Sequence, residues 1–186
     1  MTELTPTPTT DEHPRIFADF ETLGDALDYA AKGRKGFNFH DARATLVKVY
    51  PFSELREDAL AAAHRLIAFG VKPGDRVALI ADTEPQFCAL FFGAVYAGAL
   101  PVPLPLPTSF GGKESYVDQI GVQLDSCDPC ILLFPDEITE LASAAGESRD
   151  IPVFGWDRFA EREASEGELP KAKGSDIAYL QYSSGS

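Results

Sequence analysis

The chain of 186 residues alternates between short continuous apolar runs and longer stretches in which apolar residues recur every three or four positions. The short runs are typical of strands buried in a sheet, and the wider spacing is typical of helices with one apolar face. This alternation predicts an α/β fold, a mostly parallel sheet flanked by helices on both faces. The expected strands are residues 77–81, 100–102, 130–134, 151–154 and 177–182.

The expected helices have favourable end residues beside their apolar stripes. Ser53 is the expected N-cap of the strongest one, and Gly70 ends it. Thr22 and Thr83 are the expected N-caps of two others, and Pro85 suits the first turn because its missing N–H is harmless there. The helix after Thr83 is apolar nearly all round and is expected to be buried. The expected helices are residues 23–30, 55–67, 87–96, 115–127, 136–145 and 156–162.

Two segments depart from this alternation. Residues 36–40 and 46–52 flank the polar residues 41–45, which predicts an N-terminal hairpin. Four prolines occupy every second position from 101 to 107. Because proline cannot donate to a sheet, we expect them to leave the sheet as an extended connector. A proline-recognition ligand is the alternative, but the segment lacks the charged flanks of such ligands.

Composition restricts the partners and the cellular location that we expect. The chain has 16 basic against 29 acidic residues and a formal net charge of -13, which disfavours nucleic acid and anionic membranes as partners. No apolar run reaches membrane-spanning length, and the start lacks the pattern of a signal peptide. Three cysteines without a secretory signal fit a reducing compartment, so a cytoplasmic protein without integral membrane association is expected. The Thr/Pro-rich residues 1–14 are an expected disordered tail.

The last four residues are the strongest candidate site. The apolar run 177–182 leads into Ser183, Ser184, Gly185 and Ser186. In such a turn after a strand, backbone N–H groups and hydroxyls converge on phosphate oxygens, and glycine lets the backbone come close. On the four residues alone, a flexible Ser/Gly tail is the favoured interpretation, and the apolar run before them and the α/β pattern upstream shift the balance toward a site.

A family resemblance also favours the site. Residues 176–186, Asp-Ile-Ala-Tyr-Leu-Gln-Tyr-Ser-Ser-Gly-Ser, resemble the start of the phosphate-loop motif of the AMP-forming adenylating enzymes, and most closely that of the fatty-acyl-AMP ligases. In that family the motif continues through Thr-Gly to Pro-Lys-Gly. Two earlier blocks, residues 70–80 and 92–103, are similar to the family's early region and stand in the expected order. Residues 15–186 therefore look like an incomplete N-terminal subdomain.

The resemblance implies an activity for the parent protein. A fatty acid would react with ATP, accompanied by Mg²⁺, to give an acyl-adenylate and pyrophosphate. The acyl group would pass to an acyl carrier protein or a polyketide or nonribosomal peptide synthase carrier domain, or to CoA in an acyl-CoA synthetase. Ser183, Ser184, Gly185 and Ser186 would hold the ATP phosphates. No catalytic residue is expected within the chain, which alone should be inactive; a non-catalytic α/β binding module is the other alternative.

Other chemistry-bearing residues have simpler interpretations. Cys127-Asp-Pro-Cys130 has C-x-x-C spacing, but a zinc site needs two more ligands, and a thioredoxin-like site needs its first cysteine at a helix start. We interpret the pair as packing cysteines around a turn. His64 is expected at the polar edge of its helix, and residues 161–173 as a charged surface loop. No metal site is expected.

Overall fold

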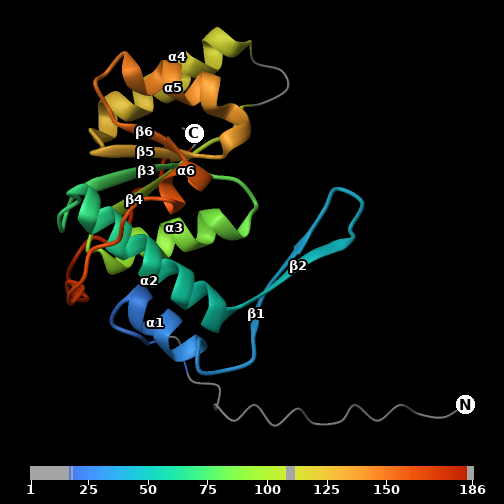
Figure 1. Ribbon diagram of the computed structural model, residues 1–186, viewed down its shortest axis with the longest axis vertical. Helices are drawn as coiled ribbons and strands as arrows, with labels where there is room; N and C mark the ends of the chain where they lie inside the picture. Colours follow the sequence, from blue (N-terminus) through green and yellow to red (C-terminus); the bar gives the residue numbers. More distant parts are fainter. Residues whose placement is uncertain (1–16, 18, 108–111, 184–186) are drawn as a thin grey trace, which may run out of the picture.

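The computed structural model describes residue 17, residues 19–107 and residues 112–183, and it contains a four-stranded parallel sheet with helices on both faces (Figure 1). The strand order is β4-β3-β5-β6. The predicted fold class is confirmed, and the expected tail, residues 1–14, lies outside the described residues. The strands are β3 Arg76–Ile80, β4 Leu100–Leu104, β5 Ile131–Phe134 and β6 Val153–Gly155.

Burial on both faces explains why these strands are apolar throughout. Side chains alternate along a strand, so Val77 and Leu79 of β3 enter the core on one face. Ala78 and Ile80 enter the core on the other face. All four are fully buried, as a central strand of a parallel sheet requires.

The helices form one layer on each face. On one side lie α2, α3 and α6, with α1 packed against α2 and α3. On the other side lie α4 and α5, the latter preceded by a 3₁₀ turn, η1. The bounds are α1 Leu23–Ala30, α2 Phe52–Phe69, α3 Pro85–Tyr96, α4 Lys113–Cys127, η1 Asp136–Ile138, α5 Thr139–Glu147 and α6 Trp156–Ala160.

Two of the expected helix caps are wrong. Thr22 does cap α1, because its Oγ1 accepts from the backbone N–H of Asp25 at 3.1 Å. Ser53, however, lies inside the first turn of α2, since Pro51 already has the extended backbone of an N-cap and the helix starts at Phe52. Thr83 precedes Glu84, which is the residue at the cap position of α3, and no side chain caps that helix. Pro85, the first residue of α3, has no backbone N–H and so leaves no donor without an acceptor in the first turn.

Helices α2 and α3 approach closely because small residues face each other. Gly93 of α3 is buried, and a Cβ atom at that position would lie 2.6 Å from the Cβ atom of Ala62 in α2. The expectation that α3 is buried holds in part. Leu90 and Ala94 are buried, whereas Phe87 and Phe91 are only half-buried at the margin of the same core.

The predicted hairpin is confirmed as β1 Gly36–His40 paired antiparallel with β2 Leu46–Pro51. The Asp41 carboxylate organises its turn by accepting from the backbone N–H groups of Arg43 and Thr45, at 2.9 and 2.8 Å. These bonds hold the pKa of Asp41 below its ordinary value. At its base, Phe39 and Tyr50 are buried with Leu55. Its far part stands away from the body (Figure 1).

The prolines of β4 are part of the sheet, so the expectation of a connector beginning at Pro101 is wrong. The Leu100 N–H donates to the Asp75 carbonyl at 2.7 Å, and the Leu104 carbonyl accepts from the Ala81 N–H at 2.8 Å. Because alternate residues bond on opposite sides, Pro101 and Pro103 face away from β3, where β4 is the sheet edge. Proline is tolerated at an edge because no neighbour there needs its N–H.

No helix in the described ranges is both long and apolar enough to cross a membrane.

Candidate functional site

The segment before the predicted phosphate loop is not the buried strand that its apolar composition predicts. Residues 177–183 have no regular secondary structure, and Ile177 is 65% exposed. One backbone hydrogen bond joins the segment to the sheet, from the Leu180 N–H to the Pro101 carbonyl at 3.1 Å. The physical reason lies in β4. Its outward prolines offer carbonyl acceptors but no N–H donors, so a reciprocal ladder cannot form.

Side chains hold this segment instead. The Tyr182 hydroxyl donates to the Gln123 carbonyl of α4 at 2.8 Å, and Leu180 packs against the core under α4 and α5. The Tyr179 ring meets Phe91 edge-on, with ring centroids 5.7 Å apart.

Two contacts show in which direction residues 177–183 run relative to β4. Ala178 lines a pocket together with Gly98, which precedes β4, and Leu180 then bonds to Pro101 within β4. The segment therefore runs in the same direction as β4, toward the edge at which the parallel strands end. In open α/β sheets, ligands bind outside the carboxyl ends of the strands.

The structure describes one of the four predicted phosphate-binding residues. Ser183 is exposed, and its hydroxyl has no hydrogen-bond partner within the described ranges. A free, exposed donor is compatible with a phosphate ligand. Ser184, Gly185 and Ser186 lie outside the described residues. The assignment of all four residues to a phosphate site stays a prediction.

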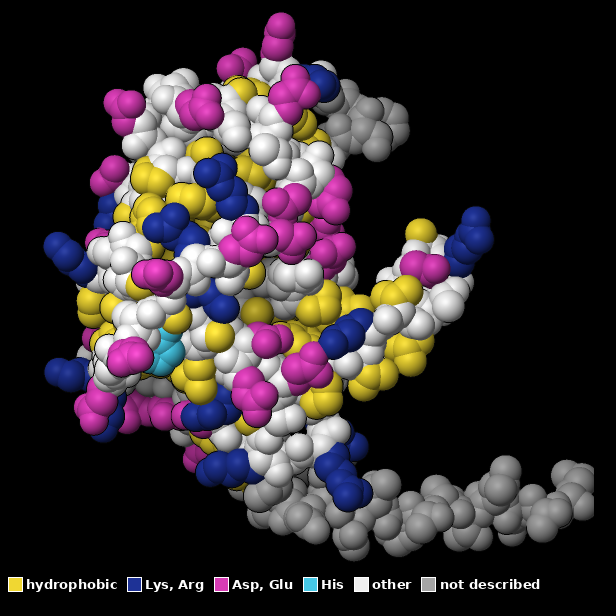
Figure 2. Space-filling view, in the orientation of Figure 1, with side chains coloured by type: hydrophobic (Ala, Val, Ile, Leu, Met, Phe, Trp, Pro, Cys, Tyr) yellow, Lys and Arg dark blue, Asp and Glu magenta, His cyan; other side chains and the backbone are white. Residues whose placement is uncertain are grey.

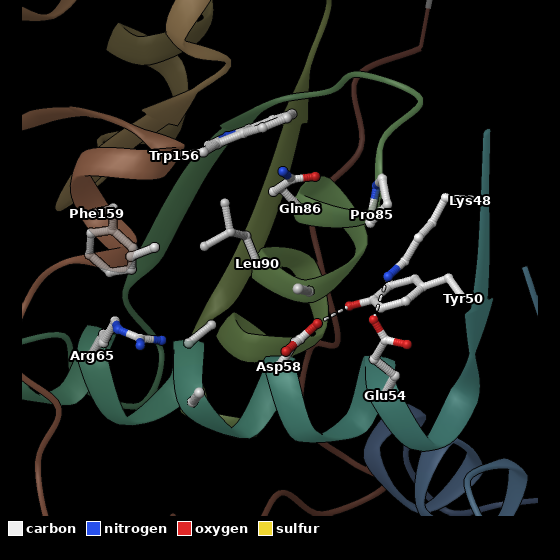
Figure 3. A pocket seen from close by; sticks show the side chains of 14 residues that line it. Lys48, Tyr50, Glu54, Asp58, Arg65, Pro85, Gln86, Leu90, Trp156 and Phe159 are labelled. Carbon is white, nitrogen blue, oxygen red and sulfur yellow. Dashed lines mark hydrogen bonds and ion pairs between the residues drawn. The ribbon is translucent and has the colours of Figure 1, made fainter. Parts of the chain in front are cut away.

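A cavity of about 540 Å³ lies at the same edge of the sheet, between the hairpin and α6 (Figure 3). We call it the hairpin pocket. Its floor is apolar and comes from α2 and α3, with Ala62, Ala89 and Leu90. The sequence analysis missed it because its residues come from four elements with no common spacing. The full lining is Lys48, Tyr50, Glu54, Asp58, Ala61, Ala62, Arg65, Pro85, Gln86, Ala89, Leu90, Trp156, Phe159 and Ala160.

At the hairpin end of this pocket the polar groups are already paired. Lys48 Nζ lies 2.6 Å from Glu54 Oε1, and the Tyr50 hydroxyl donates to Asp58 Oδ2 at 2.7 Å. Burial and the neighbouring Asp58 carboxylate raise the pKa of Tyr50 far above its ordinary value. Tyr50 therefore keeps its proton at neutral pH and acts as a fixed hydrogen-bond donor.

At the α6 end, two buried donors have no partner among the described residues. They are Nε of Arg65 on α2 and the indole Nε1 of Trp156 on α6. Trp156 is only 5% exposed. Buried donors normally have an acceptor, so these two are exceptions among the described residues.

Acidic groups gather where the strands end. Burial, then the neighbouring carboxylates of Asp82, Glu137 and Asp157, raise the pKa of Glu84. Within the described part of the chain, no three His, Cys, Asp or Glu side chains are arranged to hold a metal ion.

The two cysteines of the C-x-x-C sequence pack in the turn between α4 and β5. Cys127 is buried at the end of α4, Cys130 is half-buried, and both are free thiols. Burial raises the pKa of Cys127, and it raises that of Cys130 to about 11, which makes both poor nucleophiles at neutral pH. Arg76 ties this turn to β3, with its Nε donating to the Cys127 carbonyl at 2.8 Å. His64 contacts the surface loop, where the Ser165 N–H donates to the His64 carbonyl at 3.0 Å.

Comparison with known proteins supports the family suggested by residues 176–186. The family described as AMP-binding enzyme matches residues 37–186. A putative acyl-CoA synthetase from Caulobacter vibrioides is 40% identical, covering 99% of this chain and 32% of the relative. The long-chain-fatty-acid–AMP ligase FadD32 from Mycobacterium marinum is 33% identical, covering 62% of this chain and 18% of the relative.

Similar solved structures point to the same family. One from structural and functional studies of fatty acyl-adenylate ligases from E. coli and L. pneumophila has a TM-score of 0.89 at 40% identity, covering 93% of this chain and 31% of that chain. Another, fatty acyl-adenylate ligase from L. pneumophila in complex with acyl adenylate and pyrophosphate, has a TM-score of 0.70 at 26% identity, covering 90% of this chain and 29% of that chain.

The fold and the matched residues therefore define a subdomain of the adenylate-forming class. The chain belongs to the AMP-binding enzyme family. It spans about a third or less of the length of these relatives.

Proposed function

We propose that this chain is the N-terminal part of an enzyme that activates a fatty acid with ATP. A longer polypeptide of the relatives' length, containing these 186 residues, is called the full-length enzyme below. In the reaction a carboxylate oxygen of the fatty acid attacks the α-phosphorus of ATP. The bond from that phosphorus to the pyrophosphate oxygen breaks, giving an acyl-adenylate and pyrophosphate.

The observation that carries this proposal is the combined sequence and structure match. A TM-score of 0.89 at 40% identity over 93% of the chain goes with a solved structure from work on fatty acyl-adenylate ligases. The family match also runs through residue 186 and includes the predicted phosphate loop. In this reading residues 15–186 are an incomplete N-terminal subdomain and residues 1–14 a disordered tail.

The chain's own part in the reaction is to bind and orient the phosphates. Ser183, Ser184, Gly185 and Ser186 would offer hydroxyl and backbone donors to the phosphate oxygens. Such donors act most strongly as negative charge develops on the leaving pyrophosphate. Since the chain carries a net charge of -13, the favourable field has to come from these local donors. ATP would bring Mg²⁺ with it, and the described residues offer no separate metal cluster.

Two forms of this function differ in the thiol that accepts the acyl group. We favour a carrier-protein thiol, because residues 179–186 resemble the fatty-acyl-AMP ligases most closely. A relative from Moorena producens, 27% identical, is named medium-chain-fatty-acid–[acyl-carrier-protein] ligase JamA. CoA is the alternative, suggested by the name of the Caulobacter relative. Offering the full-length enzyme equal concentrations of holo-acyl carrier protein and CoA, and measuring both thioesters by mass spectrometry, separates the two.

The proposal is tested by fatty-acid-dependent exchange of pyrophosphate into ATP. The full-length enzyme should catalyse exchange with medium- and long-chain fatty acids, and the 186-residue chain alone should not. The chain alone supplies only part of the phosphate contacts. Exchange with amino acids but not with fatty acids would contradict the substrate class. Exchange by the isolated chain would contradict its being an incomplete site. We further propose a cytoplasmic enzyme without integral membrane association or nucleic-acid partners.

A further inference from the structure

Tyr182 directly precedes the predicted phosphate loop, and its hydroxyl ties the chain to α4. That hydroxyl donates to the Gln123 carbonyl at 2.8 Å, across 59 positions of sequence. The side chains of Ser126 and Cys127, on the same helix, lie beside it. This part of α4 is a fixed support, because the neighbouring Leu124 is fully buried in the core. Burial raises the pKa of Tyr182, so the hydroxyl keeps its proton for this bond at neutral pH.

Beyond Leu180, Tyr182 is the only described residue of this segment that bonds to the rest of the protein. The last backbone hydrogen bond to the sheet is made by the Leu180 N–H. The Gln181 side chain accepts from the Tyr179 hydroxyl at 3.4 Å, a contact that stays within the segment. Because Ser183 follows Tyr182 directly and has no described partner, its position depends on the Tyr182 hydroxyl.

Tyr179 offers an internal comparison. It lies on the same segment and is similarly exposed, at 42% against 36% for Tyr182. Its ring packs against Phe91, but its hydroxyl reaches only Gln181, two residues further along. The Tyr179 hydroxyl therefore joins the segment to itself, whereas the Tyr182 hydroxyl joins it to α4. Figure 2 shows the face of the molecule over α2 and the hairpin, on which acidic side chains are numerous.

We propose that Tyr182 is a positioning residue for the phosphate loop, whose hydroxyl anchors Ser183, the first residue of the loop, to α4. This inference rests on the proposed function for the ligand of the loop. The hydroxyl acts through Ser183 and touches no phosphate itself. A loop that is anchored at its start has less conformational freedom to lose when phosphates bind, so the anchor strengthens binding of the two outer phosphates of ATP.

Steady-state kinetics of the full-length enzyme test the anchor. Tyr182→Phe removes the hydroxyl and keeps the ring. It should lower kcat/KM for ATP about 2- to 10-fold, the range that one net hydrogen bond gives, and leave KM for the fatty acid unchanged. Inhibition by AMP, which lacks the two outer phosphates, should also stay unchanged. Tyr179→Phe is the matched control and should alter none of the three values. An unchanged kcat/KM for ATP in Tyr182→Phe, or equal weakening of AMP and ATP, would overturn the proposal.

Amide hydrogen exchange without nucleotide tests the anchor independently of catalysis. In the full-length enzyme, peptides that contain residues 178–183 should exchange about 2- to 10-fold faster in Tyr182→Phe than in the wild type, because the segment opens more often. Tyr179→Phe should leave the rate unchanged. Equal rates in all three proteins would overturn the proposal. Because this readout needs no adenylation, it decides the anchor even if the wild type uses no fatty acid, a result that would contradict the proposed function alone.

Discussion

The contact between α2 and α3 gives a prediction whose size can be worked out from the structure. At Gly93 an added Cβ would stand 2.6 Å from Ala62 Cβ, about 0.8 Å short of the 3.4 Å at which ordinary contact begins. It would also stand 3.1 Å from the Ala59 carbonyl oxygen and 3.3 Å from the Ala63 nitrogen. These are backbone atoms of a helix and cannot rotate away.

Gly93→Ala should therefore lower the free energy of unfolding. Overpacking of this kind costs about 2–3 kcal/mol. The better helix propensity of alanine returns about 1 kcal/mol. The net loss of about 1–2 kcal/mol corresponds to a fall of roughly 2–8 °C in the midpoint of thermal unfolding, for a domain of this length.

Urea and thermal denaturation followed by circular dichroism measure this difference. Adding Ala62→Gly to Gly93→Ala removes the opposing methyl group but costs about 1 kcal/mol of helix propensity in α2. The double variant should therefore be more stable than the sum of the two single losses predicts. Gly112→Ala is the control without a clash, since a Cβ there meets nothing within 4 Å; because Gly112 is the N-cap of α4, a loss of up to about 1 kcal/mol is expected from the cap alone. A Gly93→Ala protein as stable as the wild type would refute the close packing of α2 and α3.

Two further predictions concern the turn between α4 and β5. Arg76→Met removes bonds to the Cys127 carbonyl and the Asp128 carboxylate, both at 2.8 Å, and should lower the free energy of unfolding by about 1–3 kcal/mol; a loss no larger than that of Arg43→Met would contradict this tie. Because burial raises the pKa of Cys130 from 9.0 to about 11, its alkylation by iodoacetamide at pH 8 should be roughly 100-fold slower in the folded than in the unfolded chain. The same raised pKa of Cys130 favours the folded state below pH 9, and this contribution to the free energy of unfolding should be lost as the pH rises from 9 toward 11. A free energy of unfolding that rises over this window, or fast alkylation of the folded chain, would contradict the burial of the Cys130 thiol.

Much of the fold was predictable because burial on both faces leaves a local signal. The strands at Val77 and Ile131 are short apolar runs, and the helix that ends at Gly70 has a regular stripe. The hairpin was predictable because a polar stretch separates its strands, and Asp41 closes the turn within that stretch.

The wrong predictions each depended on a neighbour that the local pattern does not show. Residues 177–182 have the composition of a buried strand, but the available edge of β4 lacks N–H donors at Pro101 and Pro103. Ser53 looks like a helix cap, but the fixed backbone of Pro51 starts the helix earlier. The hairpin pocket leaves no local signal, because Lys48 and Trp156 are more than 100 residues apart in the chain. The phosphate loop is assigned by resemblance alone, and the role of all four of its residues, Ser183 to Ser186, stays a prediction.

The most direct test of the central claim is pyrophosphate release by the full-length enzyme carrying Ser184→Ala and Ser186→Ala, at saturating fatty acid. Loss of one donor from a preorganised oxyanion-type site costs about 3–4 kcal/mol of barrier, and a loop that water can enter should lose less per serine. We predict a clear fall in pyrophosphate release with an unchanged midpoint of thermal unfolding, because a loop tip makes few apolar contacts. Unchanged release would contradict the phosphate-loop assignment, and a large fall in the midpoint would show that the two serines are structural.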